Sequence, residues 1–282
     1  MLALRSRNLP ILRVPATRAG EMLVRLLGAE GDPDCLGPYE RRFRVISYQS
    51  FSKAARFNDL VESVQHCDLC PRLGARRKVL SSANGSMDSR VLFVAEAPGR
   101  LGADRTGVPL YGGNNFEVLL GNIGWRREEV FITNAVLCNP KQENGNNGTP
   151  TQEEIANCSA YLEMVIALIN PDVIVTLGTT ALKALAMLSP HGIELRDGVA
   201  QTVPWRNTRL FPLYHPGPRA ILHRSLAKQR SDFMLLSKIV HRDSLNERIP
   251  APRGRGCSPP YPLLLTQFPS FHSLYHARML LL

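Results

Sequence analysis

Four short apolar segments along the middle of the chain constrain its fold more than any other feature of the sequence. They are rich in β-branched and aromatic residues and cover 91–95, 130–136, 173–177 and 210–214. The stretches between them carry apolar residues at helical spacing. Strands that are apolar throughout and alternate with helices form parallel sheets that are buried on both faces. The sequence therefore predicts an α/β fold with helices on both faces of a parallel sheet.

Ligands of such sheets bind at the carboxyl ends of the strands, so the residues that follow each segment are the first candidates for function. Glu96 follows the first segment, where an unpaired carboxylate would cost several kcal/mol, so it meets either a partner or a ligand. Asn134 lies near the end of the second segment, where its amide either contacts a ligand or caps a turn. His215 follows the fourth segment and precedes Pro216, a position that suits a ligand contact as well as a packing role.

The rest of the chain differs in composition from this middle part. We expect a variable extension over 1–50, a folded domain over 51–240, and a proline-rich tail without a fixed fold over 241–282. The formal net charge of +10 favours a polyanionic partner such as nucleic acid. We find no apolar run that could span a membrane, no secretory signal and no nucleotide-binding motif. We therefore expect a cytoplasmic protein with no membrane association and no nucleotide cofactor.

Four of the six cysteines lie in or beside the predicted elements, and they suggest a metal site. Cys67 and Cys70 form a CxxC pair, Cys138 follows a predicted strand, and Cys158 lies in an amphipathic segment. Four cysteines at such spacing hold either a zinc ion or a [4Fe–4S] cluster, and a redox-active CxxC pair is the third alternative. Cys35 and Cys257 fall outside the predicted domain, and we expect no ligand role for them.

Several motifs occur in the order found in one family of proteins. They are Glu96-Ala97-Pro98-Gly99, the stretches 105–109 and 133–138, Gly112, the stretch 149–155, Tyr214-His215-Pro216, and the four cysteines. Together they cover about residues 60 to 240, and the chain resembles the family 4 and family 5 uracil-DNA glycosylases. The resemblance implies a three-layer sandwich with a central four-stranded parallel sheet, and a [4Fe–4S] cluster on Cys67, Cys70, Cys138 and Cys158.

The resemblance also implies a function and a set of site residues. A monofunctional DNA glycosylase would flip uracil or another deaminated base out of DNA and hydrolyse its N-glycosidic bond, and we expect a bacterial or archaeal monomer. We expect catalytic roles for His215, Asn134, Glu96 and Asp104, the two acids being equal candidates for placing the water. The predicted base contacts are Ala97, Pro98, Gly99, Leu110, Tyr111 and Asn134. The predicted DNA contacts are Arg72, Arg76, Arg77, Lys78, Arg219 and Ile221.

The chain departs from the family pattern at several positions. Glu96 is similar to family 4, whereas the spacing from Pro98 to Gly107 is similar to family 5. Where relatives place a phenylalanine against the base, this chain has Leu110 followed by Tyr111, and it carries a longer insert over 139–148. The alternative function is a non-catalytic, nucleic-acid-binding metal or iron–sulfur protein of the same fold.

Overall fold

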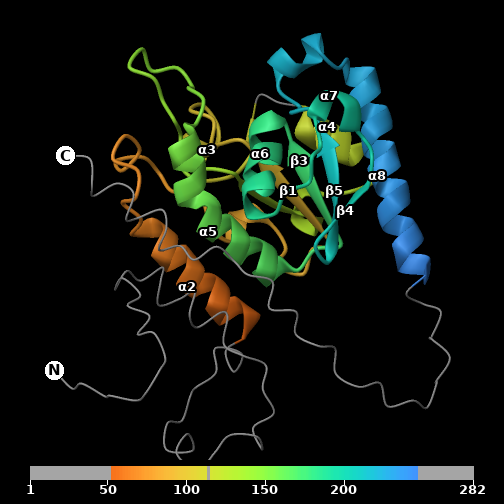
Figure 1. Cartoon of the computed structure of the whole chain (residues 1–282), viewed down its shortest axis with the longest axis horizontal. Helices are drawn as coiled ribbons and strands as arrows, with labels where there is room; N and C mark the ends of the chain where they lie inside the picture. The colour runs from red at the N-terminus through yellow and green to blue at the C-terminus, as the bar shows by residue number, and fades with distance from the viewer. Residues whose placement is uncertain (1–51, 113–114, 247–282) are drawn as a thin grey trace, which may run out of the picture. The chain divides into compact units, whose positions relative to one another are not determined.

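The computed structural model describes residues 52–112 and 115–246, which form helices on both faces of one sheet (Figure 1). The sheet has five strands in the spatial order β2, β1, β3, β5, β4. Their bounds are β1 (Val91–Ala95), β2 (Phe131–Asn134), β3 (Val173–Leu177), β4 (Val203–Trp205) and β5 (Thr208–Leu213). Four of these strands, β2, β1, β3 and β5, run parallel to one another. The prediction of four parallel strands at these segments is therefore confirmed, and their carboxyl ends lie at the same edge of the sheet.

The expected number of four strands is wrong, because β4 adds a fifth that pairs antiparallel with β5. This strand has only three residues, and a pattern of alternation cannot be recognised over so short a stretch. It also contains Pro204, a residue that sequence patterns associate with the ends of strands and that is tolerated at a sheet edge.

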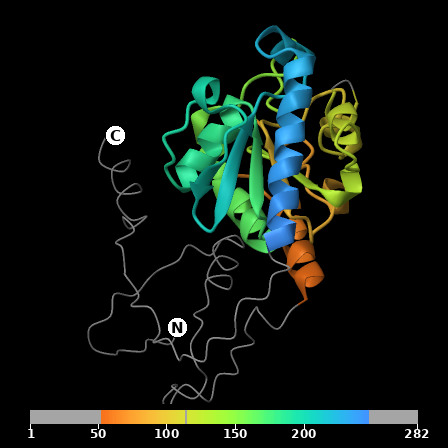
Figure 2. The ribbon, with the colours of Figure 1, turned by 90° about the vertical axis from the view of Figure 1, so that its right-hand side faces the viewer.

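Helices cover both faces of the sheet, as the alternation of strand and helix predicted. On one face, Leu92 and Val94 of β1 pack in a core with α2 (Lys53–Gln65), α5 (Gln152–Ile169) and α6 (Thr179–Leu188). On the other face, Val91, Phe93 and Ala95 pack with α4 (Phe116–Gly121) and α8 (Leu226–Asn246). Figure 2 shows α8 running along this second face. The structure is therefore a three-layer sandwich.

Short helices and turns make the connections between the layers. They are η4 (Ser82–Asn84), α3 (Ala103–Thr106), η5 (Arg127–Glu129), α7 (Leu195–Gly198) and η6 (Pro218–Leu222). α5 begins with a capping box in which Thr151 and Glu154 satisfy each other's backbone amides, which fixes the start of the helix. None of the described helices is both long enough and apolar enough to cross a membrane.

The edge of the sheet at β2 is covered by a glycine. Gly85 forms an antiparallel bridge with Phe131, and the Asn84 side chain donates to the carbonyl of Ile132. Gly85 has a φ of 121°, and a Cβ there would lie 1.9 Å from the Val130 carbonyl oxygen. Only glycine allows this close approach of two backbones.

The predicted extension over 1–50, residues 247–282 of the predicted tail, and both Cys35 and Cys257 lie outside the described residues. α8 continues past residue 240, where we expected the folded domain to end, and its last residue is Asn246.

Candidate active site

A cavity of about 760 Å³ opens at the carboxyl ends of the parallel strands. It is bounded by residues that follow all four of these strands. Eight predicted site residues line it: Glu96, Ala97, Pro98, Gly99, Leu110, Tyr111, His215 and Arg219. The sheet edge named from the sequence is thus the edge that holds the cavity, and residues distant in sequence meet there.

His215 stands in the cavity with its ring oriented by the loop that follows β5. The backbone N–H of Gly217 donates to Nδ1 of His215 over 2.9 Å. Nδ1 is therefore the acceptor, and the single proton of a neutral ring must be on Nε2. Burial lowers the pKa of His215, which favours the neutral ring. The imidazole is thus held as a neutral hydrogen-bond donor through Nε2.

Asn134 does not line the cavity but ends the neighbouring strand β2. Its Cα is in register with Ala95 on β1, immediately before the cavity residue Glu96. Its side chain is only 2% exposed, and its amide nitrogen has no hydrogen-bond partner among the described residues. A buried amide without a partner costs about 1 to 3 kcal/mol, so Asn134 has a donor that a ligand could satisfy.

The two acids that the sequence left equal occupy different places. Glu96 lines the cavity, and its Oε2 accepts a 2.5 Å hydrogen bond from the hydroxyl of Thr180 near the start of α6. Asp104, in α3, is not among the lining residues. Its charge acts instead on Cys138, whose thiol pKa is raised mainly by burial and to a smaller extent by Asp104. Of the two, Glu96 is the one positioned to act on a ligand in the cavity.

Leu110 and Tyr111 form one wall of the cavity. Leu110 has a φ of 53°, in the left-handed region that a leucine rarely adopts. A Cβ at Gly102 would lie 2.2 Å from the carbonyl oxygen of Tyr111, so the backbone packs closely behind this wall. Tyr111 is half-exposed at the cavity mouth, which leaves both side chains available to a ligand.

Two asparagines of the insert over 139–148 belong to the site, although the sequence analysis assigned them no role. The Asn139 amide donates to the carbonyl of Pro98 and, over 3.0 Å, to Oδ1 of Asn147. Oδ1 of Asn147 also accepts the backbone N–H of Arg100 over 2.9 Å. The insert thereby fixes the Pro98–Arg100 loop. The only sign of this role in the sequence is a run of asparagines beside a glycine-rich turn.

Three of the four basic residues proposed as phosphate contacts use their side chains within the fold. Arg72 makes a bidentate pair with Glu154, Arg77 donates to the backbone of Asp104, and Lys78 donates to Gly74. The side chain of Arg76 has no hydrogen-bond or ion-pair partner among the described residues, and its backbone N–H donates to Leu73. Arg100 and Arg219 both line the cavity, and Arg100 was missed although it directly follows the Glu96–Gly99 motif.

The helix η6, part of which lines the cavity, carries two exposed apolar side chains, Ile221 and Leu222, which we call the apolar tip. Ile221 is 37% exposed and Leu222 is 87% exposed, an unusual degree for a leucine. Arg224, just after this tip, forms a bidentate pair with Asp232 of α8, whose side chain is only 3% exposed. Asp232 thus anchors the end of the loop while its apolar side chains face solvent.

The four candidate ligand cysteines come together although their elements are far apart in sequence. Cys67, Cys70 and Cys138 pack against the core that contains the buried Cys158, and all four are free thiols. Each of the six pairs among them interacts electrostatically. Burial raises the pKa of Cys138 to about 11 and that of Cys158 to about 12. As thiols they are neutral at pH 7, and a metal centre would have to displace their protons.

The arrangement of these thiols bears on what they could hold. Within 52–112 and 115–246, no group of three or more His, Cys, Asp or Glu side chains is placed to hold a metal ion. Asn157 also donates to Sγ of Cys70 over 3.5 Å, and the Leu137 backbone N–H donates to Cys158. Such N–H donors are the usual neighbours of cluster sulfurs.

The fold and this site together define an α/β protein with a cavity at the carboxyl ends of its parallel strands. The family model of the uracil DNA glycosylase superfamily matches residues 83–236, more than half of the chain. The chain therefore belongs to the uracil DNA glycosylase superfamily, as the ordered motifs of the sequence indicated.

Relatives of both types that the sequence resembles are found. A type-4 uracil-DNA glycosylase of Thermotoga maritima is 38% identical over 55% of this chain and 78% of its own. A type-4 enzyme of Archaeoglobus fulgidus is 30% identical over 64% of this chain and 92% of its own. A type-5 uracil-DNA glycosylase of Pyrobaculum aerophilum is 28% identical over 57% and 83%. Relatives named for both types are thus among the proteins that this chain is similar to.

Proposed function

We propose that this protein is a monofunctional DNA glycosylase that removes uracil from DNA by hydrolysis and leaves an abasic site. The observation that carries the proposal is the pairing, at one sheet edge, of a neutral histidine donor with an unsatisfied buried amide. Membership of the superfamily and similarity to enzymes named for this activity support it. We expect the protein to act in the compartment that contains the DNA. We also expect it to act as a monomer.

Departure of the base leaves negative charge on uracil, and His215 is suited to stabilise that charge. Its neutral ring donates through Nε2, because Nδ1 is occupied by the Gly217 N–H. We assign this donor to uracil O2. A preorganised donor of this kind typically contributes about 10² to 10³ in rate, because it is directed at charge that develops in the transition state.

Asn134 is suited to recognise the base before any bond breaks. Its amide nitrogen, which has no partner in the described structure, would donate to uracil O4, and its oxygen would accept from N3–H. Cytosine presents a donor where uracil has O4 and an acceptor where uracil has N3–H, so it would leave buried groups unsatisfied. Leu110 and Tyr111 would contact the faces of the base from the cavity wall.

The water must attack the sugar from the side opposite the departing base. Asn134 is in register with Ala95, which packs on the face covered by α4 and α8. Glu96 follows the end of β1 and is bonded to Thr180 of α6, a helix of the other face, which supports an approach from the opposite side of the base. We assign to Glu96 the placing of the water, and to Asp104 no contact with substrate.

DNA would approach the cavity along its positively charged and apolar rim. We assign phosphate contacts to Arg100, Arg219 and Arg76, and the filling of the space vacated by the base to Ile221 and Leu222. Flipping costs a few kcal/mol and is cheapest at a mispair, so uracil opposite guanine should be removed most readily.

We assign Cys67, Cys70, Cys138 and Cys158 as ligands of a [4Fe–4S] cluster. The mutual proximity of four free thiols and the N–H donors beside them support this assignment. A bound cluster would cross-link the CxxC loop, the loop after β2, and α5. We assign no part of base removal to the cluster, and all of it to the cavity residues.

The decisive experiment is single-turnover cleavage of an oligonucleotide that contains one uracil, with thymine and cytosine oligonucleotides as controls. We expect abasic product from uracil DNA alone. Asn134→Asp should weaken both binding and cleavage, because a carboxylate facing O4 repels it in the ground state. A folded, iron-loaded protein that binds DNA but releases no uracil would instead support the non-catalytic alternative.

A further inference from the structure

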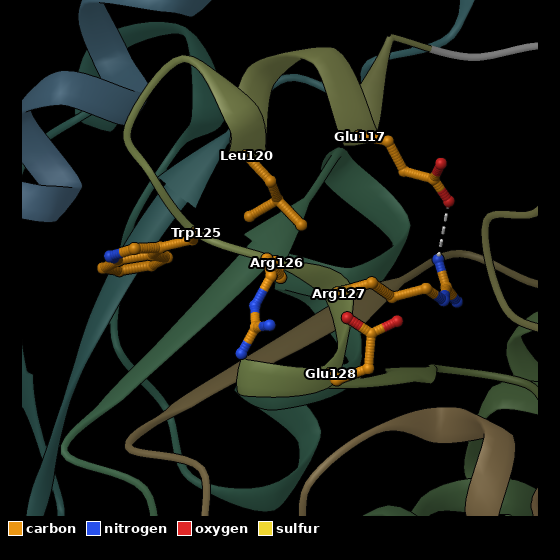
Figure 3. A pocket seen from close by; sticks show the side chains of 6 residues that line it. All are labelled: Glu117, Leu120, Trp125, Arg126, Arg127 and Glu128. Atoms are coloured by element: carbon orange, nitrogen blue, oxygen red, sulfur yellow. Dashed lines mark ion pairs between the residues drawn. The ribbon is translucent and has the colours of Figure 1, made fainter.

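Arg127 joins the cavity wall to the helix that follows it. Its Nη2 donates to the carbonyl oxygen of Pro109, directly before Leu110 and Tyr111. Its Nη1 lies 3.5 Å from Oε1 of Glu117 in α4, and its side chain is only 15% exposed. Figure 3 shows the guanidinium of Arg127 extending to Glu117. One side chain thus fixes the chain on both sides of the wall.

This arrangement is not explained by stability alone. Burial lowers the pKa of Arg127, so the fold desolvates a cation whose partner Glu117 is 61% exposed. A pair that is exposed on one side contributes little, and an apolar side chain of similar size often serves as well in the same space. The contact with Pro109 provides another reason for a guanidinium, because Nη2 can donate to that carbonyl while Nη1 faces the Glu117 carboxylate.

The wall that Arg127 holds is strained. Leu110 has a φ of 53°, and such a conformation costs about 1 to 3 kcal/mol and persists only where the surrounding structure imposes it. The close approach of Gly102 to the Tyr111 carbonyl supports the wall from behind. The bond from Arg127 to the residue immediately before Leu110 supports it from the side of η5 and α4.

We propose that Arg127 is a positioning residue for base recognition, which holds Leu110 and Tyr111 in the conformation that contacts the flipped uracil. The proposal rests on the proposed function. Arg127 does not line the cavity, so its effect on uracil passes through the wall. A displacement of about 1 Å in a group that positions a substrate can cost about a hundredfold in rate.

The chain offers a matched control in the adjacent residue. Arg126 has the same charge, but its side chain is 77% exposed, pairs with Glu129, and points away from the pair in Figure 3. Arg127→Met, Arg127→Lys and Arg126→Met should be compared with wild type on protein matched for iron content. The measurements are the single-turnover rate, the inhibition constant of free uracil, and the affinity for DNA that already contains an abasic site.

We expect Arg127→Met to lower the rate by about tenfold or more and to weaken inhibition by free uracil by a similar factor. Its affinity for abasic DNA should stay within about threefold of wild type, because no base occupies the cavity in that complex. Arg127→Lys, which has one fewer directed contact, should be intermediate, and Arg126→Met should match wild type. If Arg127→Met does not fold, the Lys variant carries the comparison.

A double-mutant cycle tests whether Arg127 acts through the wall. If it does, Arg127→Met should cost less in a Tyr111→Ala background than in wild type, because the ring that it positions is gone. Equal losses in both backgrounds, or an Arg127→Met enzyme that matches Arg126→Met, would overturn the proposal. A wild-type protein that releases no uracil would refute the proposed function instead, so the two failures are distinguishable.

Discussion

The hydroxyl of Thr180 donates a 2.5 Å hydrogen bond to Oε2 of Glu96, and this bond joins the start of α6 to the end of β1. Thr180 is buried, so no solvent competes for the carboxylate on that side. The bond leaves Oε1 of Glu96 for a water in the cavity. We expect Thr180→Val, which keeps the shape of the side chain, to lower the single-turnover rate by about tenfold through misplacement of Glu96.

Thr180→Ser is the control for this prediction, because it retains the hydroxyl and should recover most of the rate. Glu96→Gln should be slower than Thr180→Val, and adding Thr180→Val to it should change the rate little. If Thr180→Val slows Glu96→Gln as much as it slows wild type, Thr180 does not act through Glu96.

His215 should affect the chemical step far more than binding. Uracil that is still bonded to the sugar carries little charge, so a donor to O2 matters chiefly in the transition state. We expect His215→Ala to bind uracil DNA within a few-fold of wild type while its single-turnover rate falls by about 10² or more. A rate within about fivefold, roughly 1 kcal/mol on the barrier, would remove His215 from the mechanism.

The protonation of His215 leads to a separate prediction about pH. Burial lowers its pKa in the folded protein below the unfolded value of about 6.5, so the folded state favours the neutral ring. The corresponding contribution to stability is present above about pH 6.5 and is lost as the pH falls below it. The contribution of His215 to cleavage should therefore be constant from about pH 6.5 to 8 and should weaken only at lower pH.

An NMR titration of the imidazole, assigned by comparison with His215→Ala, measures this directly. Protonation of Nδ1 removes the acceptor for the Gly217 N–H, so the Gly217 amide signal should shift over the same pH range. A His215 midpoint above about 6.5 would contradict the prediction.

The ion pair of Arg72 and Glu154 should support the cluster site rather than DNA binding. Arg72 lies two residues after Cys70, and Glu154 lies one helical turn before Cys158 on α5. The carboxylate is buried by the fold, but hydrogen bonds from Arg72 and Thr151 hold its pKa below the usual range. We expect Arg72→Met to lower iron content and thermal stability while DNA affinity per iron-loaded molecule changes little.

Cys67→Ala and Cys138→Ala provide the reference for that measurement. Each should give colourless and poorly soluble protein, because three thiolates cannot hold the cluster and the loops lose their cross-link. Arg76→Met is the matched control, since the Arg76 side chain has no partner among the described residues and should affect DNA affinity only. Iron-replete Cys variants would contradict the ligand assignment.

The residues outside 52–246 should be dispensable for base removal. No cavity or cluster residue that we assign lies outside that range. A protein truncated to 52–246 keeps the whole of α8, whereas one ending at residue 240 lacks residues 241–246 of this helix and should be less stable. Uracil release by the 52–246 protein at a rate similar to that of the full chain would confirm the expectation, and a folded but inactive protein would refute it.

Strand identity could be predicted from the sequence because each parallel strand is apolar along its length. The bounds of β1 and β3 agree with the predicted segments, whereas β2 is shorter than its segment by Val130 at the start and by Ala135 and Val136 at the end. β4 could not be predicted, because three residues around a proline carry no periodicity.

The site could be predicted only in part, for a reason that Glu96 and Asp104 illustrate. Both are acids that follow β1, and sequence position does not reveal that the turn into α3 takes Asp104 away from the cavity. In the same way, the basic residues beside the CxxC pair predict a DNA contact at Arg72, and local spacing does not reveal its pairing with Glu154, 82 residues away. Loop geometry and long-range pairs decide such roles, and neither is encoded in local spacing.

The two edge strands of the sheet affect how readily this protein could pair with strands of other chains. At β2 the bridge made by Gly85 occupies hydrogen-bonding groups that another strand would need, and at β4 the outermost strand is short and contains Pro204, which lacks an N–H. Exposed strand edges are templates for aggregation. Gly85→Ala would force the bridge away from Val130 and expose the edge of β2, so this variant should aggregate at a lower protein concentration than wild type, as light scattering can measure.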